Sequence, residues 1–373
     1  MQAKTTGKVR LDHSEIEVFG QQRANITALV DHKRHLSKPT LANDAISRNT
    51  RSHQAGRPVD VGLIDWMSVC GDFSVTAGKQ TEGRAKLGAY ETWYRITGDL
   101  GSPKPPVFIL HGGPGAAHNY ADSYKLLARD GRAVIHYDQL GCGNSTLLPH
   151  KGAEFWTPQL FVDELENLVD TLGQRAGFHV LGQSWGGMLA AEYGTRQPQG
   201  VKSLTIANSP ASMALWVSEA MRQRAAMPQD IQDALNKHEA AGTYSDPEYQ
   251  KATMWVYERH VCRVVPFPPE VTASFDQIAR DPTVYHTMNG PNEFFVLGTL
   301  KNWNIIPELH KINVPTLIIS GRHDEATPAC VQPYKDHIKG SLWVIFENSS
   351  HMPHVEEKEL CMKTVGEFLG AND

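Results

Sequence analysis

The sequence predicts an α/β protein, with a mostly parallel sheet, helices on both faces of the sheet and an inserted helical cap. Three observations support this fold class. From residue 105 onward, short apolar runs alternate with stretches of helical periodicity, as in strands that are joined by crossover helices. Glycine-rich turns follow two of the apolar runs. Residues 209–300 interrupt the alternation with a helical pattern and no strand-like repeat.

The predicted strands are short apolar runs, and the first of them is expected to open the sheet. They cover residues 89–95, 106–110, 132–137, 178–182, 203–207, 315–320 and 342–346. Three helices are predicted outside the insertion. Residues 160–172 repeat apolar side chains at helical spacing, residues 185–195 begin with two glycines soon after a strand, and residues 356–369 close the chain.

The chain divides into three parts. We expect residues 61–208 and 301–373 to form the sheet domain and residues 209–300 to form the cap. A cap in this place would lie over the carboxyl ends of the strands, where open α/β sheets bind ligands. Residues 1–60 hold ten Lys or Arg residues but one aromatic residue, with poor periodicity. They are expected to be a flexible or accessory extension rather than an independent domain.

Composition and charge narrow the function classes. The net charge is -5 and the pI is about 6.4, without the basic stripe that nucleic-acid binding needs. No apolar run approaches the ~20 residues of a membrane span, and the first residues lack the apolar core of a secretory signal. The five cysteines are scattered and form no Cys-x-x-Cys pair. We therefore expect free thiols in a cytoplasmic protein and no zinc site.

The clearest catalytic motif is Gly182-Gln183-Ser184-Trp185-Gly186, which matches G-x-S-x-G between a predicted strand and a predicted helix. A sharp turn from strand to helix lifts the serine hydroxyl out of the sheet. Small residues two positions before and after the serine allow the chain to pass closely. The sequence therefore predicts Ser184 as a nucleophile.

A second glycine-rich turn, residues 111–115, directly follows a predicted strand. It is similar to the turn that supplies one oxyanion-hole N–H group in many esterases. Gly113 is predicted to supply that N–H group, and Trp185, at the start of a helix, to supply the other. Two such donors matter because each can lower the barrier by ~3 kcal/mol.

Asp324 and His351 follow the last two predicted strands. The order Ser, Asp, His is that of the α/β-hydrolase fold, and placement after successive strands brings the three residues to one edge of the sheet. His351 would accept the serine proton, and Asp324 would hold the imidazole tautomer and stabilise its charge. Glu325 is an alternative acid, and His323 or His354 is an alternative base.

Taken together, these residues resemble the proline iminopeptidase family over roughly residues 85–370. The closest likeness is to its tricorn-interacting aminopeptidase branch, and amino-acid amidases share the pattern. The resemblance rests on the motifs at 111–115, 138–145, 182–187, 289–294 and 321–328. It implies an α/β-hydrolase domain with a helical cap and the release of an amino-terminal residue, often proline, from short peptides. No metal or organic cofactor is implied.

The resemblance also implies an amine-binding site. In that branch acidic side chains bind the free ammonium of the substrate, and by motif position these would be Glu293 and Glu325. The physics agrees, because a buried ammonium needs a carboxylate partner. Phe294, Phe295 and Trp303 follow the first anchor and could wall an apolar pocket. As alternatives, Glu293 would be a solvated cap residue, Glu325 would only tune the triad, and the aromatic residues would be core.

The predicted activity is acyl transfer to water through an acyl-enzyme, which cleaves an amide next to a free amino-terminal residue in a small molecule or short peptide. Three alternatives stay open. They are an L-amino-acid amidase, a carboxylesterase or lactonase that is indifferent to a free amine, and a ligand-binding protein that retains the fold. The sequence makes no prediction of the oligomeric state.

Overall fold

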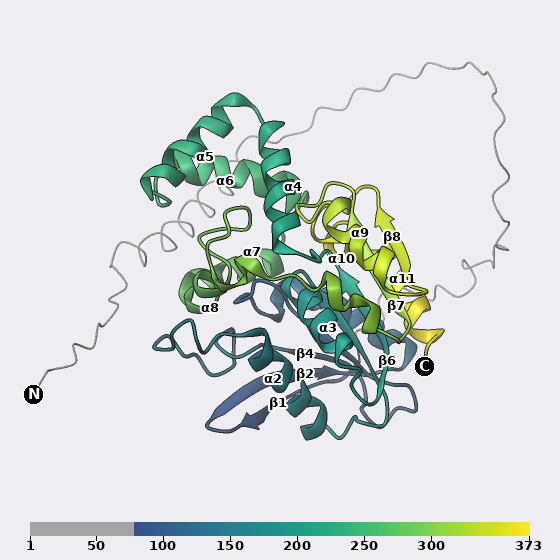
Figure 1. The fold of residues 1–373 in the computed structure, drawn as a ribbon. Coiled ribbons are helices and arrows are strands. Elements are labelled where there is room, and N and C mark those ends of the chain that lie inside the picture. The colour runs from purple at the N-terminus through teal and green to yellow at the C-terminus, as the bar shows by residue number, and fades with distance from the viewer. Residues whose placement is uncertain (1–77) are drawn as a thin grey trace, which may run out of the picture. The chain divides into compact units, whose positions relative to one another are not determined.

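A computed structural model describes residues 78–373 (Figure 1). The predictions for residues 1–60, and for the chain up to residue 77, lie outside the described residues. Eight strands form one sheet in the order β1-β2-β4-β3-β5-β6-β7-β8. The strands are β1 (Gln80–Leu87), β2 (Tyr90–Thr97), β3 (Val107–Leu110), β4 (Val134–Tyr137), β5 (Phe178–Gln183), β6 (Val201–Ala207), β7 (Thr316–Gly321) and β8 (Leu342–Phe346).

The sheet is parallel from β4 across to β8, and β2 alone runs antiparallel to its neighbours, β1 at the edge and β4. The prediction of an α/β fold with a mostly parallel sheet is confirmed. The prediction of a single opening strand at 89–95 is incomplete, because β1 precedes it. Most of β1 is exposed and polar, and its backbone pairs with β2 alone, so it carries no apolar alternation.

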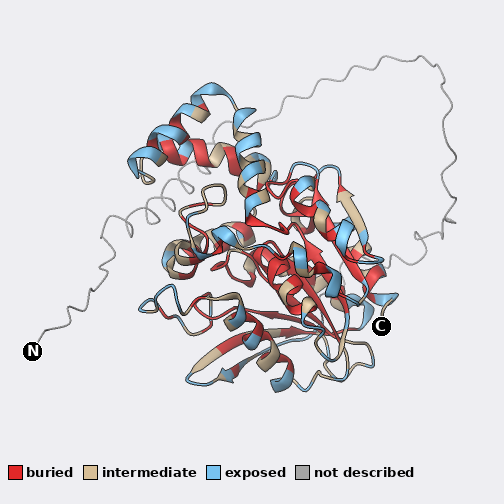
Figure 2. Cartoon of the chain, viewed as in Figure 1, coloured by how far each residue is buried: buried red, intermediate tan, exposed pale blue. Residues whose placement is uncertain are grey.

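Helices cover both faces of the sheet, as Figures 1 and 2 show. The helical elements are η2 (His118–Asp130), α2 (Pro158–Thr171), α3 (Trp185–Thr195), α4 (Met213–Ala225), α5 (Gln229–Ala241), α6 (Pro247–His260), α7 (Pro269–Arg280), α8 (Thr283–Met288), η3 (Thr299–Asn302), η4 (Ile306–Lys311), α9 (Pro328–His337), α10 (Pro353–Glu356) and α11 (Lys358–Gly370). The predicted closing helix is thus two helices, α10 and α11, with Glu357 between them.

Strand β3 shows how the two faces are filled. Its side chains alternate between the faces, because successive residues of a strand point in opposite directions. Phe108 and Leu110 belong to the apolar cluster formed with α2 and α3, whereas Val107 and Ile109 belong to the cluster formed with η2 and α11. All four strand residues are buried, so β3 lies in the centre of the core.

The cap helices α4 to α8 all lie between β6 and β7. A third apolar cluster joins α5, α6 and α7 to Ala116 and Tyr120, which follow β3, and to Met352, which follows β8. The insertion therefore packs onto the turns at the carboxyl ends of the strands. None of the helices in residues 78–373 is long and apolar enough to cross a membrane.

Candidate active site

Ser184 lies in the tight turn between β5 and α3. Its backbone has a φ of 57° and a ψ of -125°, a strained region that residues other than glycine rarely adopt. The turn depends on two glycines. A Cβ at Gly182 would lie 1.9 Å from the carbonyl oxygen of Gly186, and a Cβ at Gly186 would lie 2.0 Å from the carbonyl oxygen of Leu110. Larger residues at either position would displace backbone, and with it the serine.

The structure brings His351 and Asp324 together at the same edge of the sheet, after β8 and β7. His351 Nδ1 lies 2.7 Å from Asp324 Oδ1, so this nitrogen donates to the carboxylate and leaves Nε2 to face the cavity that Ser184 also lines. Burial lowers the pKa of His351. The Asp324 carboxylate, and then the charge of Glu293, outweigh that effect, and the pKa lies above its usual value of 6.5.

Asp324 is held in place by groups that the sequence analysis did not identify. Asn208, directly after β6, donates its side-chain N–H to Asp324 Oδ2 at 2.6 Å. The backbone N–H of Ala326 donates to Oδ1 at 2.8 Å. Asn208 adopts a positive φ of 52°, which asparagine tolerates better than most residues. A polar residue at the carboxyl end of a central strand was the available signal.

A chain of hydrogen bonds links the glycine-rich turn at residues 111–115 to His351. The backbone N–H of Gly112 donates to the hydroxyl of Tyr120 at 2.6 Å, and this hydroxyl donates to Oε1 of Gln183. Gln183 in turn donates from Nε2 to the carbonyl oxygen of His351 at 2.8 Å. Three separate turns are therefore fixed relative to one another by two side chains that motif reasoning passed over.

Gly113 and Trp185 both border the space beside the serine hydroxyl. Trp185 is the first residue of α3, where a backbone N–H has no acceptor within the helix. Its indole Nε1 donates to Oε1 of Gln139 at 2.8 Å, and the Gln139 amide donates to the carbonyl oxygen of His111 at 2.9 Å. This bridge fixes the helix start against the turn that carries Gly113.

Two cavities meet at Ser184 and share Gly113 and Glu293 as lining residues. The first has an empty volume of about 410 Å³, which includes space open to solvent. It contains His351 and Glu325, and its apolar wall is formed by Tyr120, Val261, Val271, Phe275, Ile278 and Met352. The wall of the second is formed by Trp185, Met188, Met213, Trp216 and Leu300, among others.

Both predicted acidic anchors border the first cavity. Glu293 accepts a hydrogen bond from the Tyr285 hydroxyl at 2.7 Å, and burial raises its pKa. Glu325 is buried, and neither of its carboxylate oxygens has a hydrogen-bond partner in the described part of the chain. One of these oxygens lies 3.8 Å from His351 Nε2. Burial, followed by the charges of Glu293 and Asp324, raises the pKa of Glu325 well above its usual value.

The three predicted aromatic wall residues lie elsewhere. Phe294 borders an adjoining cavity that also contains Glu325. Phe295 packs against Tyr244, with ring centroids 6.3 Å apart, and Trp303 donates to Oε1 of Glu192 at 2.8 Å. Neither Phe295 nor Trp303 lines the two cavities at the serine, so a pocket role for these two residues stays a prediction. Residues that follow the anchor in sequence turn away from it, and cap helices supply the wall instead.

The alternative bases also lie away from the two cavities at Ser184. His354 is buried, and its Nε2 lies 3.0 Å from the carbonyl oxygen of Tyr120, while its ring stacks on Tyr124. His323 is exposed. Among the described histidines of the last two turns, His351 alone combines a carboxylate partner with a place beside the serine.

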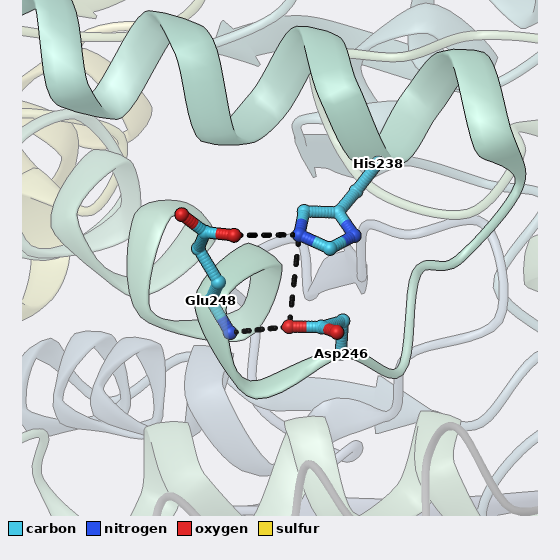
Figure 3. A group of neighbouring side chains, drawn as sticks. All are labelled: His238, Asp246 and Glu248. Carbon is cyan, nitrogen blue, oxygen red and sulfur yellow. Dashed lines mark hydrogen bonds and ion pairs between the residues drawn. The ribbon is translucent and has the colours of Figure 1, made fainter.

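One group of His, Asp and Glu side chains in the described residues could offer three metal ligands (Figure 3). It lies in the cap, at the connection between α5 and α6. Its carboxylates already have partners, since Asp246 caps α6 by accepting from the backbone of Glu248 at 2.8 Å, and Glu248 pairs with Lys237 at 2.6 Å. His238 lies 3.1 Å from Glu248. These contacts account for the group, and we assign no metal to it.

Comparison with known proteins agrees with this geometry. Residues 105–358 match the family described as alpha/beta hydrolase fold. A proline iminopeptidase of Clostridium botulinum is 41% identical over 302 residues, which make up 79% of this chain and 100% of that protein. A proline iminopeptidase of Lactobacillus helveticus is 40% identical over 295 residues, which make up 78% of this chain and 98% of that protein.

Two solved structures are similar at 50% sequence identity. The crystal structure of VinJ has a TM-score of 0.78 and covers 79% of this chain and 99% of its own. The crystal structure of a proline iminopeptidase from Mycobacterium smegmatis has a TM-score of 0.74 and covers 78% of this chain and 98% of its own. None of these names specifies the tricorn-interacting branch, so the narrower likeness stays a prediction.

Proposed function

Since this chain belongs to the proline iminopeptidase family of α/β hydrolases and is an aminopeptidase-type hydrolase, we propose that Ser184 releases the amino-terminal residue of a short peptide or amide through an acyl-enzyme. One observation carries the proposal. The carboxylate of Glu325, which accepts no hydrogen bond from the described residues, lines with Glu293 the cavity that contains Ser184 and His351. Hydrolysis by a serine needs neither carboxylate, whereas a substrate ammonium needs such a partner.

The reaction follows from the contacts. His351, which is unprotonated at Nε2, takes the proton of Ser184 as the hydroxyl attacks the substrate carbonyl. Asp324 holds Nδ1–H and stabilises the imidazolium that forms. The oxyanion binds to the backbone N–H groups of Gly113 and Trp185. His351 then protonates the leaving amine, and the water that replaces this amine is deprotonated by the same nitrogen and releases the amino acid.

The two cavities suggest separate places for the two halves of the substrate. The amino-terminal residue would occupy the first cavity, with its ammonium between Glu293 and Glu325 and its side chain against apolar residues such as Phe275. The leaving group would extend into the second cavity along Trp216. In this proposed arrangement the scissile carbonyl would lie at Ser184, where the two cavities meet.

The relatives favour an aminopeptidase over an esterase, a lactonase or a binding protein. An L-amino-acid amidase would use the same residues and differs only in the size of the leaving group. We place the protein in the cytoplasm. The four cysteines among the described residues are buried and unpaired, which fits a reducing compartment.

A substrate panel tests the proposal. It contains amino-acid p-nitroanilides, dipeptides and p-nitrophenyl esters, each with a free and an N-acetylated amine. We expect turnover of the free-amine amides and dipeptides, with a large loss on acetylation. Turnover of esters alone, unaffected by acetylation, would contradict the proposal and support an esterase. Turnover of p-nitroanilides without any dipeptide would restrict it to an amidase.

A further inference from the structure

We propose that Glu325 sets the requirement for a free amine by exchange: its carboxyl group holds a proton in the empty site and gives that proton to solvent when the substrate ammonium takes its place. This inference rests on the proposed function, because it concerns how the same site recognises its substrate. Recognition of the amine is then the replacement of a proton on Glu325 by the substrate ammonium, rather than the pairing of the ammonium with a carboxylate that is already ionised.

The surroundings of Glu325 do not support an isolated negative charge. The residue is 5% exposed, and neither carboxylate oxygen receives a hydrogen bond from the described residues. A buried carboxylate without a donor or a counter-ion is costly, and such a group takes up a proton instead. The backbone holds the side chain in this place, since the Glu325 N–H donates to the carbonyl oxygen of His260 at 3.2 Å.

Two more carboxylates raise the electrostatic cost of a negative charge on Glu325. Asp324 precedes it in the same turn, and Glu293 reaches the cavity from the cap turn after α8. Their charges add to the effect of burial in raising the pKa of Glu325. His351 Nε2 lies 3.8 Å from Glu325 and is unprotonated in the state that accepts the serine proton. Because the pKa of His351 lies above 6.5, His351 offers Glu325 no positive charge only at a pH above that pKa. Glu356 adds a further negative charge near His351.

The cap supplies no positive charge to offset these carboxylates. Arg224 of α4 borders the adjoining cavity with Glu325, but two nitrogens of its guanidinium group each lie 2.6 Å from an oxygen of Glu239. Burial lowers the pKa of His260 at the end of α6, which favours its neutral form. Tyr257 and Tyr285 are buried, and burial raises the pKa of each phenol, so both stay neutral.

A substrate ammonium supplies the missing charge. The balance is one carboxylic acid and one ammonium going to a carboxylate–ammonium pair, with one proton released to the buffer and no covalent bond formed. Binding of the ammonium therefore strengthens by about tenfold per pH unit below the pKa of Glu325. The gain in affinity ends at pH ~7.7–8.0, where an α-amino group loses its own proton. A neutral ligand leaves Glu325 protonated and shows no such gain, so selectivity for free amines rises with pH.

Isothermal titration calorimetry of Ser184→Ala measures this exchange without turnover. The ligands are L-prolinamide and cyclopentanecarboxamide, which has the same shape but no amine. At pH 7, where more of the His351 imidazole is neutral than at lower pH, titrations in two buffers of different ionisation enthalpy give the number of protons released. We expect about one proton for each prolinamide from Glu325, in addition to any from His351, and none for the carbocyclic amide. Equal proton counts for the two ligands would overturn the exchange.

The double variant Ser184→Ala/Glu325→Gln assigns the proton to its residue. Glutamine keeps the size of the side chain but cannot release a proton, so the count for prolinamide should fall by one. An unchanged count would assign the proton to His351 or Glu293 and overturn the proposal. Prolinamide that binds without proton release refutes the exchange alone. Failure of prolinamide to bind Ser184→Ala at any pH counts against the proposed function as well.

Discussion

Replacement of Asn208 by glycine tests the support behind the proposed triad. Asn208 donates to Asp324 Oδ2 at 2.6 Å, while Oδ1 accepts from His351 and Ala326. Glycine accepts the positive φ of this position without strain, so the change removes the hydrogen bond and leaves the backbone conformation accessible. A hydrogen bond to a charged group contributes ~1.5–3 kcal/mol, which corresponds to a loss of roughly 10- to 150-fold if it appears in the rate.

The loss should appear in kcat rather than in KM. The freed carboxylate can rotate away from His351 Nδ1, and the imidazolium that forms in the transition state is then less well stabilised. The assay is steady-state hydrolysis of a free-amine p-nitroanilide, together with thermal unfolding of both proteins. The matched control is Asn304→Gly. Asn304 is exposed, and its side chain accepts a hydrogen bond from the backbone of Ile306 rather than contacting Asp324. A lower unfolding temperature of Asn208→Gly with kcat unchanged would refute the reasoning, because Asn208 would then support only the fold.

Three further predictions concern the same site. Gly186→Ala should yield little active protein, because its Cβ would lie 2.0 Å from the carbonyl oxygen of Leu110; soluble protein with normal kcat/KM would contradict this. Glu293→Gln should lower kcat/KM for free-amine substrates far more than for simple esters in steady-state kinetics. An equal loss of kcat/KM for both substrate types would contradict the anchor role of Glu293. The pKa of His351 is raised, so kcat/KM should fall as the pH drops through a value above 6.5. Glu293→Gln should shift that acid limb to lower pH, since the Glu293 charge helps to raise it; an unshifted pH profile would contradict this coupling.

The central sheet was predictable because its strands are buried on both faces. Strand β3, for example, is a continuous run of four buried apolar residues, which is what parallel strands between two helix layers require. Strand β1 could not be predicted in this way. It lies at the sheet edge, most of its residues are exposed, and it is held by backbone pairing with β2, which leaves no pattern of side chains.

The proposed catalytic residues were predictable because topology, rather than side-chain direction, determines where they meet. Ser184, Asp324 and His351 each follow a parallel strand, and the carboxyl ends of such strands share one edge. Side-chain direction decides the remaining cases. Phe295 and Trp303 lie near the anchor turn in sequence but face other neighbours, and nothing in their spacing indicates this.

The positioning residues were missed because their role depends on contacts between distant turns. Gln183 occupies the unspecified position of its motif, yet its two amide atoms connect Tyr120 with the backbone of His351. Such a connection joins residues 168 positions apart in the chain. A contact between such distant residues leaves no pattern in a single sequence, and only the folded structure shows it.

The most direct test of the central claim is to find where a covalent serine reagent attaches. The protein is treated with a fluorophosphonate, and the modified peptide is identified by mass spectrometry as hydrolysis of a free-amine p-nitroanilide is followed. The account predicts one label per chain, on Ser184, with activity lost in proportion and neither labelling nor activity in Ser184→Ala. Full hydrolysis by Ser184→Ala, or loss of activity with the label on another residue, would contradict it.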